Sequence, residues 1–424
     1  MFQHVEMQSR ETAHEHEQDH VTLHVEQTTC CIVGGGPAGV LLALLLARKG
    51  VPVMLLEAHV DFEREFRGDT IHPPTMEIMD QLGLADRLLQ MPHTKVHGGV
   101  VQSVTGPFKF ADLDLLKTKF PYITVIAQAR FLDFLVSEAK QYPSFQLVLG
   151  AQVDELIEEH GVVRGVRYRG REGRCEVRAV LTVGADGRFS RLRHLAGFEP
   201  KKTSQPIDVL WFRLSRNESD SQEGISGRFT EKSLFALINR FDYWQIAMVI
   251  PKGGYQQIRA GGIEQFRQQL AAALPDLADR VSELKEWKQI SVLSVESNCL
   301  SRWYKPGLLL IGDAAHTMSP VAGVGINYAI QDAVTCANVL TGKLKCGTLR
   351  TRDLARVQRR RELPTRIVQA VQAFLQNRVL ASTLRSNGPV HIPLVIALLF
   401  RFGFVRALPA RLFAFGPFST RLKQ

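Results

Sequence analysis

The sequence predicts an α/β fold in which a Rossmann-like domain is interrupted by a mixed β-sheet domain and followed by a basic, helical C-terminal region. Three observations support this prediction. An apolar run at 28–33 enters a glycine cluster, and a Leu- and Ala-rich stretch and a second apolar run then complete a β-α-β unit by residue 57. Two later apolar runs each end beside an acid–glycine pair. Residues 205–299 alternate between apolar and polar positions, as the strands of a mixed sheet do.

Residues 1–27 precede the first predicted strand and are expected to form a disordered tail. They contain five histidines among Glu and Gln and show little apolar periodicity. Clustered imidazoles also bind zinc or nickel, so metal capture by this tail is the alternative. We expect ordered structure to begin at Thr28.

The glycine cluster predicts a dinucleotide-binding loop. Gly34, Gly36 and Gly39 form G-x-G-x-x-G: one glycine permits the tight turn, one admits a pyrophosphate against the backbone, and one lets helix and strand approach closely. The helix that follows presents its first amides, including that of Ala38, and its positive dipole end to the phosphates. Glu57, 23 positions after Gly34, ends the second strand and is placed to accept hydrogen bonds from a ribose diol.

The middle of the chain is predicted to contain further strands and two helices. Three apolar runs indicate strands, and the longest is broken by a His160-Gly161 turn. These runs lie at 145–149, 155–169 and 177–183. Within the mixed sheet of 205–299, helices are expected at 263–274 and 276–287.

Two segments suggest that the dinucleotide is a flavin. The apolar run before Asp186-Gly187 and the run at 308–311 before Gly312-Asp313 place acids at strand ends. Asp313 is suited to hydrogen-bond a polyol, and a glycine-bearing loop and a helix over 325–340 follow it. The residues of this loop and helix start that are candidates for cofactor binding are Pro320, Gly323, Gly325 and Asn327.

The composition is that of a soluble globular protein. With 424 residues, 45% of them hydrophobic and 22% charged, the chain is long enough for two lobes. Its six cysteines form no C-x-x-C pair and no spaced metal-ligand set, so we expect a reducing compartment and no metal centre. No apolar signal segment is visible, and the apolar run at 392–400 is much shorter than the roughly 20 residues of a spanning helix. We therefore expect a cytoplasmic protein.

The net charge of +10 is concentrated near the C-terminus. From Lys343 onward sixteen Lys and Arg residues face two acids, so this segment carries +14 and the first 342 residues carry −4. No nucleic-acid recognition module accompanies the basic segment, so we expect no nucleic-acid partner. A solvated helix face is the simplest interpretation. The sequence carries no signal for the oligomeric state.

From about residue 29 to 345 the chain resembles the single-component class A flavoprotein monooxygenases, which include para-hydroxybenzoate hydroxylase and the ubiquinone-pathway hydroxylases. The resemblance rests on three motifs in family order, Gly34–Gly39, Asp186-Gly187 and Gly312-Asp313. It implies the FAD-binding fold of that family. It also implies that Glu57 binds the adenosine ribose, that Asp313 binds the ribityl chain, and that the Asp186-Gly187 motif contributes to both FAD and NAD(P)H binding.

The resemblance implies further cofactor contacts. Arg67 and Gln128 would meet the ribityl and pyrophosphate parts of FAD, Pro320 would border the isoalloxazine, and the backbone of Gly323–Asn327 would face its N1/O2 edge. One position departs from the family pattern: many relatives have Gln between the two glycines of this loop, where this chain has Val324. The change keeps the backbone donors and alters only side-chain polarity.

The pattern and the resemblance together divide the chain into three parts. The FAD-binding domain is expected to be discontinuous, at 28–100, 120–200 and 300–345. The substrate domain is expected at 101–119 and 201–299, and residues 346–424 form the basic helical region.

The implied activity is an FAD-dependent monooxygenase reaction. NADPH or NADH would reduce FAD, and O2 would supply one oxygen atom to an apolar aromatic, polyketide-like or isoprenoid small molecule, by hydroxylation or epoxidation. No second G-x-G-x-x-G unit is present, which fits a family without a separate NAD(P)H domain. Two alternatives remain, a reductase or dehydrogenase on the same fold and a non-catalytic flavin-binding protein. A halogenase is disfavoured because no W-x-W-x-I-P segment occurs.

No catalytic base is assigned from the sequence. His72 follows the Arg67 motif, but it is interpreted as a hydrogen-bonded loop histidine. The Cys30-Cys31 pair of the first strand is interpreted as buried packing. Four residues of the mixed sheet that could line a pocket are interpreted as sheet core, namely Trp211, Arg213, Tyr243 and Trp244.

Residues 389–418 are rich in Leu, Phe, Val and Ile and carry three arginines. Amphipathic basic helices of this kind lie on anionic lipid, so weak contact with a membrane surface is one hypothesis. The alternative is that the segment docks as a lid over the substrate lobe.

Overall fold

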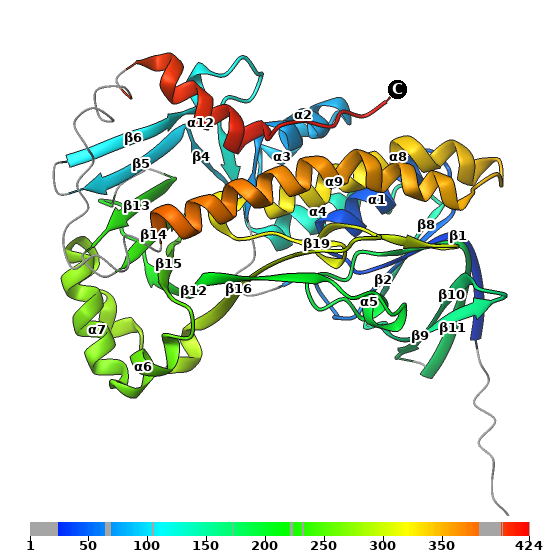
Figure 1. The fold of residues 1–424 in the computed structure, drawn as a ribbon, viewed down its shortest axis with the longest axis horizontal. Coiled ribbons are helices and arrows are strands. Elements are labelled where there is room, and N and C mark those ends of the chain that lie inside the picture. The colour runs from blue at the N-terminus through cyan, green and yellow to red at the C-terminus, as the bar shows by residue number, and fades with distance from the viewer. Residues whose placement is uncertain are drawn as a thin grey trace, which may run out of the picture.

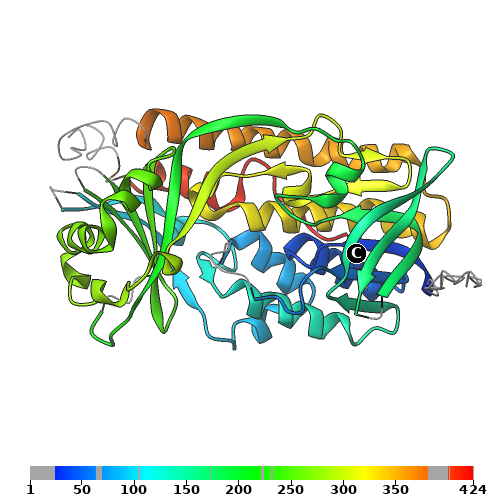
Figure 2. The same ribbon diagram turned by 90° about the horizontal axis from the view of Figure 1, so that it is seen from below.

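The computed structural model describes residues 24–63, 69–103, 106–171, 173–220, 224–230, 233–380, 400 and 402–423. It confirms the predicted α/β architecture. Two lobes lie side by side along the long axis, and one long helix, α9 (Thr351–Phe374), runs along both of them (Figure 1). The long strands β12 (Lys201–Ser215) and β16 (Ser291–Cys299) extend from the second lobe toward the first (Figure 2).

The first lobe is built on a sheet with the strand order β17-β18-β11-β1-β2-β8. From β18 to β8 the neighbouring strands are parallel, and β9 and β10 extend the sheet as an antiparallel hairpin. The turn of that hairpin is the predicted one, with His160 and Gly161 both at positive φ. The strands are β1 (His24–Val33), β2 (Val53–Glu57), β8 (Phe145–Leu149), β9 (Gln152–Glu159), β10 (Val162–Gly170), β11 (Gly173–Gly184), β17 (Tyr304–Lys305) and β18 (Leu308–Leu310).

Helix α1 forms the centre of the first lobe. It spans Pro37–Arg48, and every residue from Ala38 to Ala47 is buried because α4 (Gln128–Ala139) and α8 (Gly325–Lys345) pack against it. This burial on all sides explains its nearly continuous apolar sequence. The Cys30-Cys31 pair is completely buried, and burial raises the pKa of the Cys31 thiol to about 12, as expected of packing residues.

The second lobe is an eight-stranded mixed sheet in the order β19-β16-β12-β15-β14-β13-β5-β6. One face packs against α6 (Tyr255–Ala260) and α7 (Gly262–Ala273), and the opposite face carries a separate cluster of small and β-branched side chains. The remaining strands are β5 (Gly98–Ser103), β6 (Gly106–Asp112), β13 (Ile225–Phe229), β14 (Leu234–Asn239), β15 (Tyr243–Pro251) and β19 (His316–Thr317).

Shorter elements connect the two lobes. A small sheet, β3-β7-β4, consists of Thr70–Ile71, Ile123–Val125 and Thr94–Val96. The remaining helices include α2 (Pro73–Gln81), α3 (Ala85–Leu88), α5 (Arg191–Leu195), α12 (Gly403–Phe415), the short turns η1 (Leu113–Leu115), η5 (Gly312–Ala314) and η6 (Val321–Gly323), and the π-helix η7 (Leu375–Leu380). After α12 the chain crosses back to the first lobe, where the Leu422 N–H donates to Gln81 Oε1.

One predicted helix is wrong. The helix expected at 263–274 is present as α7, but 276–287 forms no continuous helix and contains short 3-10 turns, η2 (Pro275–Leu277), η3 (Val281–Glu283) and η4 (Trp287–Gln289). Arg280 in this segment is buried, and its Nη2 donates to Asp220 Oδ1 at 2.9 Å. The buried ion pair draws the segment onto the sheet, which a regular amphipathic helix would not allow.

The predicted start of ordered structure is also corrected. Strand β1 begins at His24 rather than Thr28, because residues 24–28 pair in register with β11. The backbone partners of residues 24–28 lie about 150 positions further along the chain, so the local sequence pattern gives no signal that these residues form a strand. The rest of the histidine-rich tail, residues 1–23, lies outside the described residues. Within the described ranges no group of three or more His, Cys, Asp or Glu could hold a metal ion.

Candidate functional site

Parallel pairing brings the three glycine motifs to one edge of the first sheet. The carboxyl ends of β1, β2, β11 and β18 lie side by side, which is where open α/β sheets bind their ligands. The loops are joined directly: the Ala185 N–H donates to Val33 O at 2.7 Å, and the Ile311 N–H donates to Gly184 O at 2.9 Å. A Cβ on Gly312 would touch Ala38 Cβ at 3.4 Å, so the first and third motifs are in contact.

The three glycines of the first loop have different roles. Gly34 has φ +108°, and a Cβ there would lie 2.4 Å from Ala185 O. A Cβ on Gly39 would lie 2.0 Å from Gly34 O, so this glycine permits the close contact of helix and loop. Gly36 has an ordinary φ of −78°, and among the described residues the nearest atom to its Cβ would be Ala185 O at 3.9 Å. No described residue therefore fills the space in front of Gly36, which fits a pyrophosphate site.

The N-terminus of α1 has no side-chain cap. Gly36 occupies the cap position without a side chain, and Pro37 is the first helical residue. The amides of the first turn, including that of Ala38, are left for an external acceptor. An uncapped helix N-terminus beside an open glycine fits the phosphates of FAD.

Glu57 is held in a defined position at the end of β2. Its carboxylate is buried, Oε2 accepts the Gly35 N–H at 2.7 Å, and Oε1 accepts the His59 N–H at 2.9 Å. The His59 ring contacts the same oxygen through Nδ1 at 2.7 Å. A carboxylate oxygen accepts more than one hydrogen bond, so the ribose diol predicted to bind here can share it. The sequence analysis did not single out His59.

The Asp186-Gly187 motif is supported by its own loop. Asp186 Oδ1 accepts the Ser190 hydroxyl at 2.6 Å, and Oδ2 accepts the Leu192 N–H at 3.0 Å, so the carboxylate caps α5. Burial raises the pKa of Asp186. Arg193 links this motif to the third one, because its Nη1 donates to Ala314 O at 3.2 Å and its Nη2 to Arg188 O at 2.6 Å.

A buried ionic network binds the backbone of the Gly312-Asp313 motif. Asp332, on α8, accepts the Gly312 N–H at 2.9 Å and His316 Nε2 at 2.6 Å. Its other oxygen accepts Arg361 Nε at 2.7 Å, and all three side chains are at most 1% exposed. Asp313 itself is only partly buried. Asp332 and Arg361 were not predicted from the sequence. The available signal for Asp332 was a lone acid in the predicted helix over 325–340, and Arg361 does not stand out within the run Arg359–Arg361.

The loop predicted to face the isoalloxazine, which we call the flavin loop (residues 317–325), is tightly bent. Gly323 has φ +61°, and a Cβ there would lie 2.4 Å from Thr70 Oγ1. Ala322 also has positive φ, at +66°, which is a strained conformation for a residue with a side chain. Among the described residues, a Cβ on Gly325 would meet Met318 alone, at 3.8 Å. Val324 turns into a buried cluster with α9, which explains why an apolar residue suits this position.

Asn327 joins the flavin loop to the β3 region. Its Oδ1 accepts the His72 N–H at 2.9 Å and the Thr75 hydroxyl at 2.8 Å, and its Nδ2 donates to Thr70 O at 2.9 Å. The side-chain amide of Asn327 is thus hydrogen-bonded within the protein. It would contribute to a cofactor site by holding the flavin loop against the β3 region. His72 is buried in this contact, which agrees with its interpretation as a loop histidine.

Of the two remaining predicted residues, Arg67 lies outside the described residues, and Gln128 lies where the two lobes meet. Gln128 begins α4, and its N–H donates to Asp69 Oδ1 at 2.9 Å. Asp69 also forms a buried ion pair with Arg240, from the β14–β15 turn of the second lobe. The candidate site is therefore tied to the sheet of the second lobe by a contact that spans 171 positions of sequence.

The aromatic residues of the sheet divide between its faces. Trp244 is buried in the cluster under α7, and its Nε1 donates to Asp220 at 2.8 Å, which confirms it as core. Arg213 lies over the ring of Tyr243 at 4.9 Å. Trp211 lies on the opposite face, beside an apolar cluster composed of Ile207, Val209, Ala247, Val249 and Val295.

An uncapped glycine loop and two acids at strand ends, Glu57 and Asp313, thus meet at one sheet edge, a set of groups whose chemistry fits a bound FAD. The family model described as FAD binding domain matches residues 27–371. The chain belongs to this family and is a class A FAD-dependent monooxygenase. It is 33% identical to 6-methylpretetramide 4-monooxygenase from Streptomyces rimosus over 398 residues, which cover 93% of this chain and 94% of that protein.

Solved structures with the same fold include enzymes of different chemistry. The p-nitrophenol 4-monooxygenase of Pseudomonas putida DLL-E4 superposes with a TM-score of 0.73 at 19% identity, over 92% of this chain and 98% of that one. A myxobacterial chondrochloren halogenase superposes with a TM-score of 0.69 at 20% identity, over 92% of each chain. At these identities the likeness establishes the fold alone.

Proposed function

We propose that this enzyme uses NADPH or NADH and O2 to hydroxylate an aromatic, polyketide-like substrate. The observation that carries the proposal is the similarity along nearly the whole chain to an enzyme whose name specifies 6-methylpretetramide. The balanced reaction consumes NAD(P)H, a proton, O2 and a C–H bond and yields NAD(P)+, water and a C–OH bond. When bound, FAD supplies the redox chemistry that links NAD(P)H to O2.

The residues of the chain would bind, orient and shield the reactants. Gly34, Gly36 and the N-terminus of α1 would hold the pyrophosphate, Glu57 the ribose, and Asp313 the ribityl chain. The flavin loop would hold the ring. The face of the second sheet that bears Val209 carries buried apolar side chains, and a flat organic substrate that reached this face would be shielded from water.

Oxygen incorporation tests the proposal. With purified holoenzyme, NAD(P)H, 18O2 and 6-methylpretetramide as the first substrate, we expect faster NAD(P)H oxidation than without substrate and a product that contains one 18O atom. A reductase would give a product without added oxygen, and a halogenase would require halide; either result would refute the proposal. Omission of NAD(P)H is the control and should give no product.

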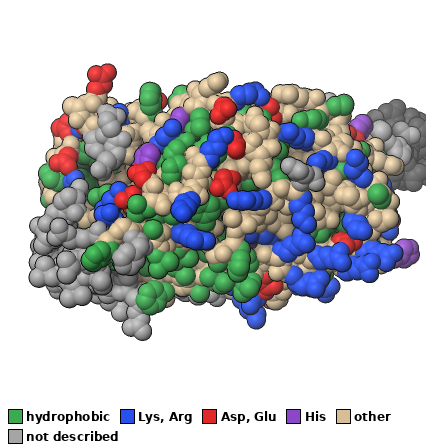
Figure 3. All heavy atoms as spheres, turned by 90° about the horizontal axis from the view of Figure 1, so that it is seen from above, with side chains coloured by type: hydrophobic (Ala, Val, Ile, Leu, Met, Phe, Trp, Pro, Cys, Tyr) green, Lys and Arg blue, Asp and Glu red, His purple; other side chains and the backbone are tan. Residues whose placement is uncertain are grey.

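We also propose weak contact between the protein and an anionic membrane surface through the exposed side of α9. That side carries Arg352, Arg359 and Arg360 near its N-terminal end and Leu363 and Phe374, 59% and 61% exposed, further on. Seen from above, basic side chains gather at the lower right and apolar ones at the lower centre of the same face (Figure 3). No helix within the described ranges is long and apolar enough to cross a bilayer.

The alternative for the C-terminal segment, docking on the substrate lobe, agrees with one finding. Ala410 and Ala414 of α12 are buried against β6 and η1. Leu408, on the outer side of the same helix, is 72% exposed. Residues 381–399, which include part of the predicted amphipathic segment, lie outside the described residues.

Charge removal on α9 tests the membrane proposal. Replacing Arg352, Arg359 and Arg360 with Gln should lower partition onto vesicles rich in phosphatidylserine by roughly 100-fold at moderate salt, because each basic residue near an anionic surface adds to binding. Co-sedimentation with vesicles measures this change. The control replaces Arg169, Arg174 and Lys288 with Gln, which removes the same charge elsewhere. Equal binding by both variants, or no binding by the unmodified protein, would exclude the contact.

A further inference from the structure

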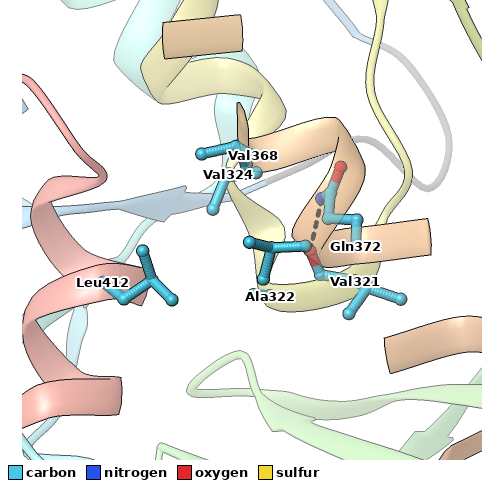
Figure 4. A pocket seen from close by; sticks show the side chains of 7 residues that line it. Val321, Ala322, Val324, Val368, Gln372 and Leu412 are labelled. Atoms are coloured by element: carbon cyan, nitrogen blue, oxygen red, sulfur yellow. Dashed lines mark hydrogen bonds between the residues drawn. The ribbon is translucent and has the colours of Figure 1, made fainter. Parts of the chain in front are cut away.

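A row of glutamines on one side of α9 and η7 contacts the back of the flavin loop. Gln369 Nε2 donates to Thr317 O and Asn298 O, both at 2.9 Å. Gln372 Nε2 donates to Ser319 O at 3.0 Å and Val321 O at 2.8 Å. Gln372 is shown against the loop in Figure 4, where it lies beside Ala322 and Val321. Residues three and four positions apart face the same way on a helix, so Gln369 and Gln372 meet neighbouring parts of the loop.

The third glutamine follows where α9 changes to π-helical geometry. Gln376 is completely buried, and its Nε2 donates to Ser319 Oγ at 2.6 Å. The wider turn of a π-helix shifts the side-chain register, and such turns occur often at functional sites. Gln376 lies four positions after Gln372, at the point where the helix has reached the second lobe and η7 contacts β12.

The row acts as a set of donors. Each amide NH2 group donates to the loop, and that of Gln369 also donates to Asn298 of β16, which pairs with Thr317. The Oε1 atoms of Gln372 and Gln376 receive no hydrogen bond from any residue in the described part of the chain. The row therefore contacts the loop through its N–H groups.

The flavin loop needs outside donors because of its own shape. Pro320 has no N–H group, and Ala322 is held at positive φ. The carbonyl groups of Thr317, Ser319 and Val321 are turned toward α9, whose glutamines donate to them, and we place the cofactor on the opposite side of the loop. A small displacement of the row would change the direction of these peptide dipoles.

We propose that the glutamine row is a positioning element that sets the backbone geometry of the flavin loop and thereby tunes the preference of the site for reduced over oxidised FAD. The inference rests on the proposed placement of the isoalloxazine at this loop. A reduced flavin carries negative charge on its ring, and backbone dipoles and the N-terminus of α8 (Gly325–Lys345) stabilise that charge only in a fixed orientation. Gln372, with two bonds to the loop, makes the largest contribution.

Helix α9 supplies a matched control. Gln358 is also buried, and it also makes two backbone bonds, accepting the Trp303 N–H at 3.0 Å and donating to Ser301 O at 2.9 Å. These bonds anchor the helix beside β17 and do not reach the flavin loop. Gln358→Leu therefore removes the same chemistry from the same helix without touching the proposed site.

The experiment measures the reduction potential of bound FAD in Gln372→Leu, Gln372→Glu and Gln358→Leu holoenzymes, together with thermal unfolding. For Gln372→Leu we expect a tenfold loss of preference for reduced FAD, which is about 30 mV for a two-electron couple. Gln372→Glu should shift the potential further in the same direction, because a carboxylate opposes both the loop carbonyls and the charge of a reduced ring. Gln358→Leu should change the preference less than twofold.

The possible results separate the inference from the proposed function. A Gln372→Leu enzyme with bound FAD and an unchanged potential would overturn the positioning role, and so would equal shifts in the Gln358→Leu enzyme. If Gln372→Leu does not fold, Gln369→Leu, at a half-buried position, decides the question by the same measurement. Failure of the unmodified protein to bind FAD would instead refute the placement of the flavin.

Discussion

Replacing Gly36 with valine should abolish tight FAD binding and leave the fold intact. A Cβ at this position would meet no atom of the described residues closer than 3.9 Å, and the φ of −78° is ordinary for valine, so we expect the free protein to tolerate the change. The isopropyl group would fill the space in front of the N-terminus of α1, where we place the pyrophosphate. We expect a loss of FAD affinity of at least about 100-fold, or about 2.7 kcal/mol.

The measurement is an FAD titration followed by flavin absorbance and protein fluorescence, with circular dichroism to monitor the fold. Gly342→Val is the matched control, because Gly342 lies exposed on α8, and a Cβ there would also meet nothing within 4 Å. It should bind FAD as the unmodified protein does. Normal FAD binding by Gly36→Val would contradict the proposed pyrophosphate site.

Replacing Arg361 with methionine should destabilise the protein more than any surface substitution, by about 3–5 kcal/mol, because it leaves the buried carboxylate of Asp332 with one cationic partner fewer. Arg361 is 1% exposed and Asp332 is completely buried. Urea-induced unfolding of the apoprotein measures the change. The double variant Arg361→Met/Asp332→Asn should recover a large part of the loss, since no uncompensated charge remains. Additive losses in the double variant would show that the two residues are not coupled.

The same pair predicts a dependence on pH. Burial tends to raise the pKa of Asp332, but His316 and Arg361 together lower it below its ordinary value. Ionised Asp332 therefore contributes its full stabilisation of the folded protein above the pKa of the carboxyl in the unfolded chain, about 3.9. This contribution is lost as the pH falls through the lower pKa of Asp332 in the folded protein. Without Arg361 the carboxyl of Asp332 is protonated at a higher pH. The loss in free energy of unfolding caused by Arg361→Met should therefore become smaller as the pH is lowered from 7 toward 4. A loss that does not depend on pH would argue against the ionic explanation.

The sequence by itself was sufficient for the local elements of the first lobe. The run from β1 through Gly34, Gly36 and Gly39 to Glu57 could be interpreted without a structure, because each of its parts depends on neighbours in the chain. A strand that is buried on both faces is continuously apolar, and a phosphate loop needs glycine at specific steps. The strand ends at Asp186 and Asp313 were recognisable for the same reason.

The contacts that support these motifs could be found only in the tertiary structure. Asp332 and Arg361 meet behind Gly312 across 29 positions, and Asn327 reaches Thr70 across 257. The helix expected at 276–287 was interrupted by the burial of Arg280 against Asp220, a partner 60 positions away. Local periodicity predicts which face of a helix or strand is buried and which face is exposed to solvent. It cannot show which distant polar group a buried amide or charge will meet, because only the packing of the two lobes and of α9 across them brings those groups together.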